Sequence, residues 1–362
     1  MVEVVAYDSP RALLKALESI PGADSVETAL AVGPLLNVEL AATKSTASTA
    51  ADAKTDAVRP DADAQIIVTV CEGGEMRLLF TKLDWSICKL VSPVDPSRLG
   101  DLAVPLIPTL RDHLLNLAPL KEAPELLRGI SGPRILVDTL LDGWPHPHDP
   151  EPSMHMKPGA CSVAPTVPAF PPGHSCARVE DFDQLDAADA EALPDLFQGF
   201  WGDHISAPKL DHAGKLAHIR QVATEEALWL YRALPPSSAG GSSTPVPIGF
   251  VHTGRPTPRT CAIRGVFVDP AHRSQSVATR MVAHVTRAHL ADAPRLEIDW
   301  SRPLEEQALE DPATKWGGKD EVCLFVEPGN PHAEQAYVRV GYRFGDVPWC
   351  DADLQGVERG HW

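Results

Sequence analysis

The segment that most constrains the fold lies at residues 265–281, where a strand pattern changes to a helical pattern within a few residues. Val266, Phe267 and Val268 form an apolar run that stops at Asp269-Pro270. A short polar loop follows, and apolar side chains then recur at helical spacing. The start of a helix has unpaired backbone N–H groups and the positive end of the helix dipole. This segment is therefore suited to hold a phosphate-bearing ligand.

The residues of this segment resemble the acetyl-CoA motif of the GNAT superfamily of N-acetyltransferases. That motif reads as a hydrophobic strand with V-x-P, two further residues, and then R/Q-x-x-G-x-G/A. Arg273 and Ala278 occupy matching positions, whereas Ser276 stands where the family usually has glycine.

A second block, residues 322–342, resembles the second signature of the same family. It contains a strand pattern, Asn330, a helical pattern with Tyr337 seven residues later, and then Gly341-Tyr342. The two signatures occur in the order that the family has. The resemblance covers roughly residues 176–350 and is weak before them.

The resemblance implies an acetyl-CoA site and no metal. In the family, the strand backbone pairs with the pantetheine arm, and N–H groups at the helix start receive the pyrophosphate. Because glycine lets a ligand come close, we expect Ser276 to lower the affinity for the cofactor. The residues predicted to bind acetyl-CoA are Val266, Phe267, Val268, Arg273, Ser274, Gln275, Ser276, Val277, Ala278, Thr279 and Asn330.

The catalytic residue that the resemblance implies is Tyr337, as the acid that protonates the departing thiolate. A phenol with a pKa near 10 is protonated at neutral pH. The alternative for Tyr337 is packing of its helix on the sheet, and for Asn330 it is capping of that helix. The general base is not identified, although Glu327, Asp269 and His252 lie near the expected cleft.

The expected fold class is α/β (α+β). The second region, residues 176–362, is predicted to be a GNAT-like acetyltransferase domain with a mixed, mostly antiparallel sheet flanked by helices. Residues 1–143 are predicted to form a second, non-catalytic α/β lobe. They include a hairpin signal, Gly73-Gly74, between two strand-like runs. One interpretation of this lobe is a degenerate GNAT-like half, and the other is an unrelated helper domain. Strands of the second region are expected at 227–233, 247–253, 260–268, 296–299 and 322–327.

The boundary between the regions is predicted at residues 144–175, which are rich in proline and lack periodicity. We expect a linker there. His146, His148, Asp149 and His155 contain metal-ligating groups, but the prolines between them break any rigid face, so we expect no metal site. Residues 301–320 are longer than the connection usual in the family and are interpreted as an insertion, either a surface loop or a segment that closes over the substrate.

The composition narrows the function classes. A net charge of −17 argues against a nucleic-acid binder and suits a cationic substrate, although it also serves solubility. The seven cysteines form no C-x-x-C pair, which predicts a reducing compartment and neither a disulfide framework nor a zinc site. No segment reads as a signal peptide or a membrane span, so we expect a cytoplasmic protein that does not bind membranes.

The sequence therefore predicts an acetyl-CoA-dependent N-acetyltransferase that acts on a primary amine of a small molecule or a protein. The alternative is an acyl-CoA-binding or regulatory module with the same fold and weak or no turnover. The sequence specifies neither the amine nor the oligomeric state.

Overall fold

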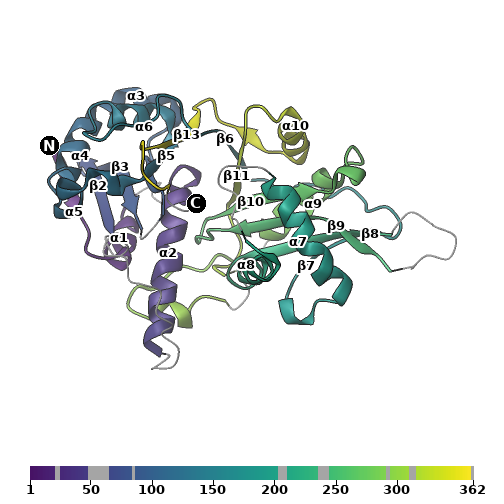
Figure 1. The fold of residues 1–362 in the computed structure, drawn as a ribbon. Helices are drawn as coiled ribbons and strands as arrows, with labels where there is room; N and C mark the ends of the chain where they lie inside the picture. The colour runs from purple at the N-terminus through teal and green to yellow at the C-terminus, as the bar shows by residue number, and fades with distance from the viewer. Residues whose placement is uncertain are drawn as a thin grey trace.

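Two lobes lie side by side and share one sheet (Figure 1). The computed structural model describes residues 1–20, 25–47, 65–83, 86–202, 210–234, 244–290, 294–309 and 315–359. Within these residues the strands follow the order β1-β2-β3-β4-β5-β13-β6-β11-β10-β9-β8-β7, and β12 also pairs with β6. The pairs β4–β5 and β10–β11 are parallel, and the other described pairs are antiparallel. The predicted mixed α/β fold with a mostly antiparallel sheet is confirmed.

The first lobe contains a five-strand run with helices packed on it. Gly73 and Gly74 turn the chain between β2 and β3 with positive φ values of 61° and 83°, as the hairpin signal predicts. The strands are β1 (Val2–Ala6), β2 (Ile66–Glu72), β3 (Glu75–Lys82), β4 (Cys88–Val91) and β5 (Gly129–Pro133). The α-helices are α1 (Pro10–Leu17), α2 (Val26–Ala47), α3 (Leu99–Leu102), α4 (Ile107–Leu114), α5 (Ala118–Glu122) and α6 (Arg134–Leu141).

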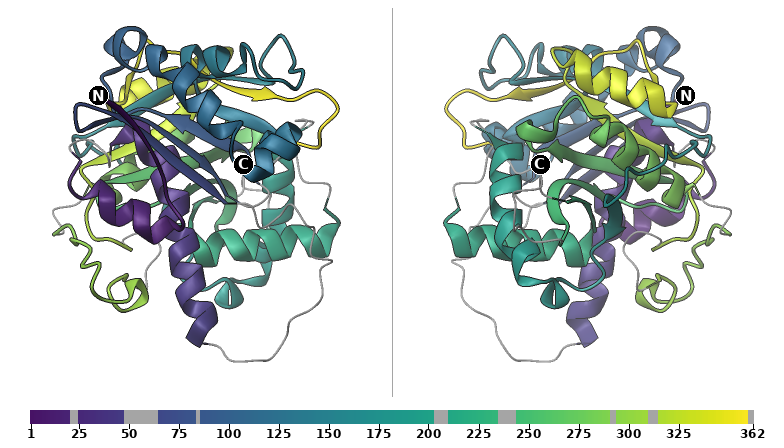
Figure 2. Two further views of the ribbon diagram at one scale, coloured as in Figure 1. Left: turned by 90° about the vertical axis from the view of Figure 1, so that its left-hand side faces the viewer. Right: turned by 90° about the vertical axis from the view of Figure 1, so that its right-hand side faces the viewer.

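The second lobe packs helices on both faces of its part of the sheet (Figure 2). Helices α7 and α8 share one apolar core with β8–β10, and α9 and α10 share another on the opposite face. The strands are β7 (Ser175–Arg178), β8 (Ala227–Ala233), β9 (Val246–Gly254), β10 (Thr260–Val268), β11 (Glu321–Val326) and the short β12 (Arg343–Phe344). The helices are α7 (Ala187–Trp201), α8 (His212–Glu225), α9 (Val277–His289) and α10 (Pro331–Val340).

The strand order of the first lobe is repeated in the second. In each lobe four antiparallel strands end in a strand that pairs in parallel with the next, β4 with β5 and β10 with β11. In each lobe an Asp-Pro step follows that strand, and the aspartate accepts a backbone N–H two residues on, at 2.9 Å for Asp95 and 2.8 Å for Asp269. The repetition supports the interpretation of the first lobe as a degenerate second copy.

The predicted linker is wrong for residues 154–161, because they form strand β6 (Met154–Cys161) in the middle of the sheet. β6 pairs with β11 of the second lobe and with β13 (Trp349–Asp353). β13 in turn pairs with β5 of the first lobe, although it follows the second lobe in the chain. Pro158 and Gly159 are unusual in a strand, so the sequence does not indicate β6. Main-chain pairing on both of its edges stabilises this strand.

The predicted strand at 296–299 is also wrong, since only an isolated bridge between Arg295 and Gly317 occurs there. The apolar side chains of this segment pack against the first lobe instead. Leu304 and Trp316 are fully buried in one core with Leu35 and Leu36 of α2. The described part of the insertion therefore joins the second lobe to α2 and is not merely a surface loop.

Candidate functional site

β10 and β11 run together and then separate. Their parallel pairing extends from Thr260–Glu321 to Ile263–Leu324. A register irregularity in the pairing of β10 with β9 follows between Ile263 and Gly265. Beyond this point β10 continues to Val268 on β9 alone, and β11 continues on β6. Among the described strands, none pairs with the edge of β10 that faces away from β9 near the end of β10, and an extended ligand with amide groups can pair there.

The loop after β10 holds two residues in the left-handed region. Ser274 has φ 63° and Ser276 has φ 59°. An L-residue adopts this conformation at a cost of about 1–2 kcal/mol, and glycine adopts it readily. The backbone at 276 therefore has the form expected of the glycine that usually stands there in the family that this segment resembles.

The loop and the first turn of α9 present a row of backbone donors. Arg280 is the first residue of the helix whose N–H has an acceptor, the carbonyl of Ser276 at 3.1 Å. Among the described residues, nothing accepts the N–H groups of residues 274–279. The Arg280 guanidinium donates to the Gln275 carbonyl at 2.6 Å and to Ala169 at 3.2 Å, which holds the loop in place. Free donors at the positive end of a helix favour an anion such as a phosphate.

Several side chains of the predicted cofactor residues contact the protein and hold the loop in place. Arg273 donates through Nε to the Val268 carbonyl at 3.1 Å, and its guanidinium lies 5.7 Å from the centre of the Phe267 ring. Phe267 and Val277 are buried, one toward α7 and the other in the core under α9. Phe267 and Val277 therefore position the backbone, and the main-chain groups and the exposed side chains of Arg273, Ser274, Gln275 and Ser276 are left to contact a ligand.

Tyr337 is buried on α10, in the same core as Val277 and Met281. Burial raises its pKa to about 12, and no described residue hydrogen-bonds its hydroxyl. Its ring lies 6.0 Å from that of Tyr342, whose hydroxyl is 2.8 Å from Thr286 Oγ1. Of the two neighbouring phenols, Tyr337 is therefore the one whose proton is not engaged with the protein.

Asn330 caps α10, since its Oδ1 accepts the N–H of Ala333 at 3.1 Å. The capping alternative for Asn330 is confirmed, and its contact with a cofactor stays a prediction. Gly341, just past the helix end, has φ 113°, as expected of a glycine that terminates a helix.

The three candidate bases have different surroundings. Asp269 caps the turn after β10, and Glu327 is exposed after β11. His252 is buried opposite Gly265, and burial lowers its pKa to about 4, so it is neutral at pH 7. None of the described residues hydrogen-bonds its Nδ1.

A polar cluster that the sequence analysis missed lies beside His252. Glu226 forms an ion pair with Arg264. The Glu226 carboxylate also lies so close to the backbone of Gly254 that a Cβ added at position 254 would be 2.8 Å from Glu226 Oε2. Although burial alone would raise the pKa of Glu226, Arg264 and His252 lower it. The available sequence signal was a charged residue, Arg264, inside the apolar strand β10.

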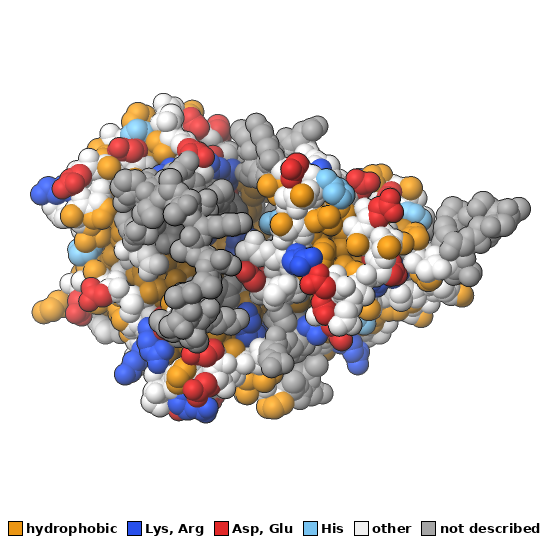
Figure 3. All heavy atoms as spheres, turned by 60° about the horizontal axis from the view of Figure 1, so that its bottom comes forward, with side chains coloured by type: hydrophobic (Ala, Val, Ile, Leu, Met, Phe, Trp, Pro, Cys, Tyr) orange, Lys and Arg blue, Asp and Glu red, His pale blue; other side chains and the backbone are white. Residues whose placement is uncertain are grey.

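Figure 3 shows charged side chains of both signs along the groove between the lobes.

No metal-binding group and no membrane helix is evident in the described part of the chain. None of the described helices is both long and apolar enough to cross a bilayer. Within the same residues, no three His, Cys, Asp or Glu side chains gather as a metal would require. The seven cysteines, all of which are described, are free thiols.

Comparison with known proteins finds a family match within the second lobe. Residues 204–299 match the model of the acetyltransferase (GNAT) family. No curated protein sequence matches the chain.

Several solved structures are similar in fold. A tandem GNAT protein from the clavulanic acid biosynthesis pathway is 14% identical, with 97% of this chain and 98% of that chain covered and a TM-score of 0.38. A GCN5-related N-acetyltransferase from Kribbella flavida is 17% identical, with 77% and 87% covered and a TM-score of 0.41. A Drosophila protein is 11% identical, with 98% of each chain covered and a TM-score of 0.49. At such similarity these structures do not bear on what this chain binds.

Proposed function

Since residues 204–299 form a domain of the GNAT acetyltransferase family, we propose that the chain is an acetyl-CoA-dependent N-acetyltransferase acting on a primary amine of a small molecule or protein. The observation that carries the proposal is the loop at 273–279. Its two left-handed serines follow the strand that separates from β11, and the N–H groups of residues 274–279 have no acceptor among the described residues. Family and loop together support acetyl transfer from a CoA thioester.

The fit of acetyl-CoA to these residues rests on two features. The backbone edge of residues 265–268 suits the amide groups of a pantetheine arm, and the N–H groups of residues 274–279 suit a pyrophosphate. Bound there, acetyl-CoA supplies the activated acetyl group. Arg273 and Arg280 fix the loop through the carbonyls of Val268 and Gln275, so its donors are oriented before a ligand arrives.

The proposed acid is Tyr337. Its burial keeps the phenol protonated well above neutral pH, and its hydroxyl has no described partner that would hold the proton. A positioned acid contributes about 10²–10⁴-fold to the rate of a reaction that needs a proton. We do not assign this role to His252 or Glu226. His252 is neutral at pH 7, and Glu226 forms an ion pair with Arg264.

The first test is calorimetric titration of the full chain with CoA, followed by thiol release from acetyl-CoA with a panel of primary amines. We expect saturable CoA binding, tighter in Ser276→Gly, and release of thiol with at least one amine. The alternative, a module without turnover, predicts CoA binding with no thiol release. Absence of CoA binding by both proteins would refute the proposal.

The second test separates the acid from its neighbour. Tyr337→Phe should lower thiol release at least a hundredfold and leave CoA binding unchanged. Tyr342→Phe is the matched control, since that phenol donates to or accepts from Thr286 and should affect stability rather than turnover. Equal turnover of the two variants would exclude Tyr337 as the acid.

A further inference from the structure

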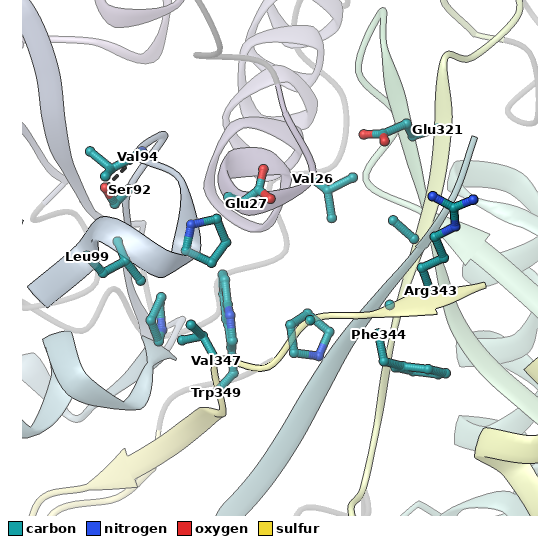
Figure 4. Close-up of a pocket in the computed structure, with 16 residues that line it drawn as sticks. Val26, Glu27, Ser92, Val94, Leu99, Glu321, Arg343, Phe344, Val347 and Trp349 are labelled. Carbon is teal, nitrogen blue, oxygen red and sulfur yellow. Dashed lines mark hydrogen bonds between the residues drawn. The ribbon is translucent and has the colours of Figure 1, made fainter. Parts of the chain in front are cut away.

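A cavity of about 280 Å³ lies between the two lobes (Figure 4). Val94 and Leu99 of the first lobe stand on one side of it, and Phe344 and Trp349 contribute to the floor and the other side. The first turn of α2 lies between them. The volume of the cavity is just below the usual range for small-molecule pockets, and most of the cavity lining is apolar.

Three charged side chains from three separate elements border this apolar space. They are Glu27 at the start of α2, Glu321 at the start of β11, and Arg343 on β12. Figure 4 shows Glu321 and Arg343 across the cavity from Val94 and Leu99, and Glu27 on α2 between the two sides. In the described part of the chain, none of the three side chains forms an ion pair.

The two carboxylates repel one another. Burial raises the pKa of Glu321, the negative charges of Glu27 and Asp320 raise it further, and the nearby Arg259 lowers it. Glu27 and Glu321 are both half-buried beside the cavity, and an ammonium group placed between them would interact favourably with both carboxylates, in addition to the attraction between Glu321 and Arg259. The guanidinium of Arg343 presents the planar donors that a carboxylate accepts.

The position of the cavity within the repeat argues against CoA as its occupant. It lies where β4 and β5 separate, after only two paired positions, and is thus the first-lobe counterpart of the opening between β10 and β11. Helix α3, however, has four residues, and no residue from 92 to 102 has a positive φ. The left-handed loop and the unpaired backbone N–H groups at the start of a long helix, which suit a pyrophosphate in the second lobe, have no counterpart in these described residues.

The cavity is also separate from the proposed acetyl-CoA site. Glu321 pairs with Thr260 at the start of β10, and the loop at 273–279 follows the other end of that strand at Val268. At about 3.3 Å per residue, the two ends of β10 are roughly 26 Å apart.

We propose that this interlobe cavity binds a small hydrophobic α-amino acid. The ammonium group lies between Glu27 and Glu321, the carboxylate meets Arg343, and the apolar side chain packs against Val94 and Leu99. The site joins residues of both lobes, so the ligand stabilises their contact. The proposal does not depend on acetyl transfer in the second lobe.

The test is calorimetric titration of the full chain with leucine, valine and phenylalanine. Two probes that each lack one charged group, 3-methylbutylamine and 4-methylpentanoate, accompany leucine. We expect at least one amino acid to bind with one site per chain, and each single-charge probe to bind at least tenfold more weakly than leucine. No saturable binding of any amino acid, or equal binding of the amine and leucine, would overturn the proposal.

Variants locate the binding. Glu321→Gln and Arg343→Gln should each weaken amino-acid binding at least tenfold and leave CoA binding unchanged. Glu191→Gln, at an exposed position of α7, is the matched control and should bind as the parent does. Val94→Phe fills the cavity and should abolish binding without removing a charge. Unchanged amino-acid binding in all three cavity variants would place the ligand elsewhere and refute the proposal.

Discussion

The left-handed backbone at Ser276 leads to a quantitative prediction. With φ 59° and ψ 23°, this residue has a conformation that costs an L-residue about 1–2 kcal/mol. Glycine removes that cost, but it also increases the conformational entropy of the unfolded chain, which lowers the free energy of unfolding by about 0.4–1 kcal/mol. The difference predicts that Ser276→Gly raises the free energy of unfolding by about 0.5–1 kcal/mol. The Ser276 side chain makes no capping hydrogen bond, so no compensating contact is lost.

The assay is urea denaturation of the full chain, in which the midpoint should rise while the slope stays unchanged. Ser276→Ala is the control, because it removes the hydroxyl and keeps the Cβ that the left-handed region disfavours. If the glycine variant is no more stable than the alanine variant, the strain argument is refuted.

Three further predictions concern two buried side chains and one half-buried carboxylate. Because burial lowers the pKa of His252 to about 4, stability should fall by up to about 3 kcal/mol as the pH drops from 6.5 toward 4, and His252→Gln should flatten this dependence in denaturation curves. Trp316→Ala should cost about 3–5 kcal/mol in the same assay, and a cost below about 1 kcal/mol would contradict its role in joining the lobes. The raised pKa of Glu321 means that its ionised form is disfavoured in the folded state, so stability is lost as pH rises through that pKa. Glu321→Gln should therefore raise the melting temperature at pH 7.5 and give no such gain at pH 3.5.

The features that the sequence predicted well are local ones. The strand at 260–268, the turn after Asp269 and the helix that follows depend on neighbouring residues, and their pattern survives in the structure. The left-handed form of Ser274 and Ser276 could not be read directly, since serine is common in ordinary turns. Only the family's glycine at that position indicated it.

The features that were missed depend on residues far apart in the chain. β6 lies in a proline-rich segment and exists because β11 and β13 pair with its two edges. Residues 296–299 have a strand-like composition, but no described strand pairs with them, and Trp316 nearby packs on α2 instead. The interlobe cavity draws its charges from positions 27, 321 and 343, and no spacing rule connects them.

The pairing of β13 with β5 of the first lobe has a consequence for how the protein is made. β5 is synthesised early, but its neighbour in the sheet, β13, emerges from the ribosome only roughly two hundred residues later. Until then the far edge of β5 presents open main-chain groups, which are prone to pair with other chains. The first lobe therefore cannot complete its sheet during translation, and the two lobes close together in a late step. Halves expressed separately on either side of residue 150 would each lack a strand that the other half carries, so they should aggregate alone and recover on coexpression.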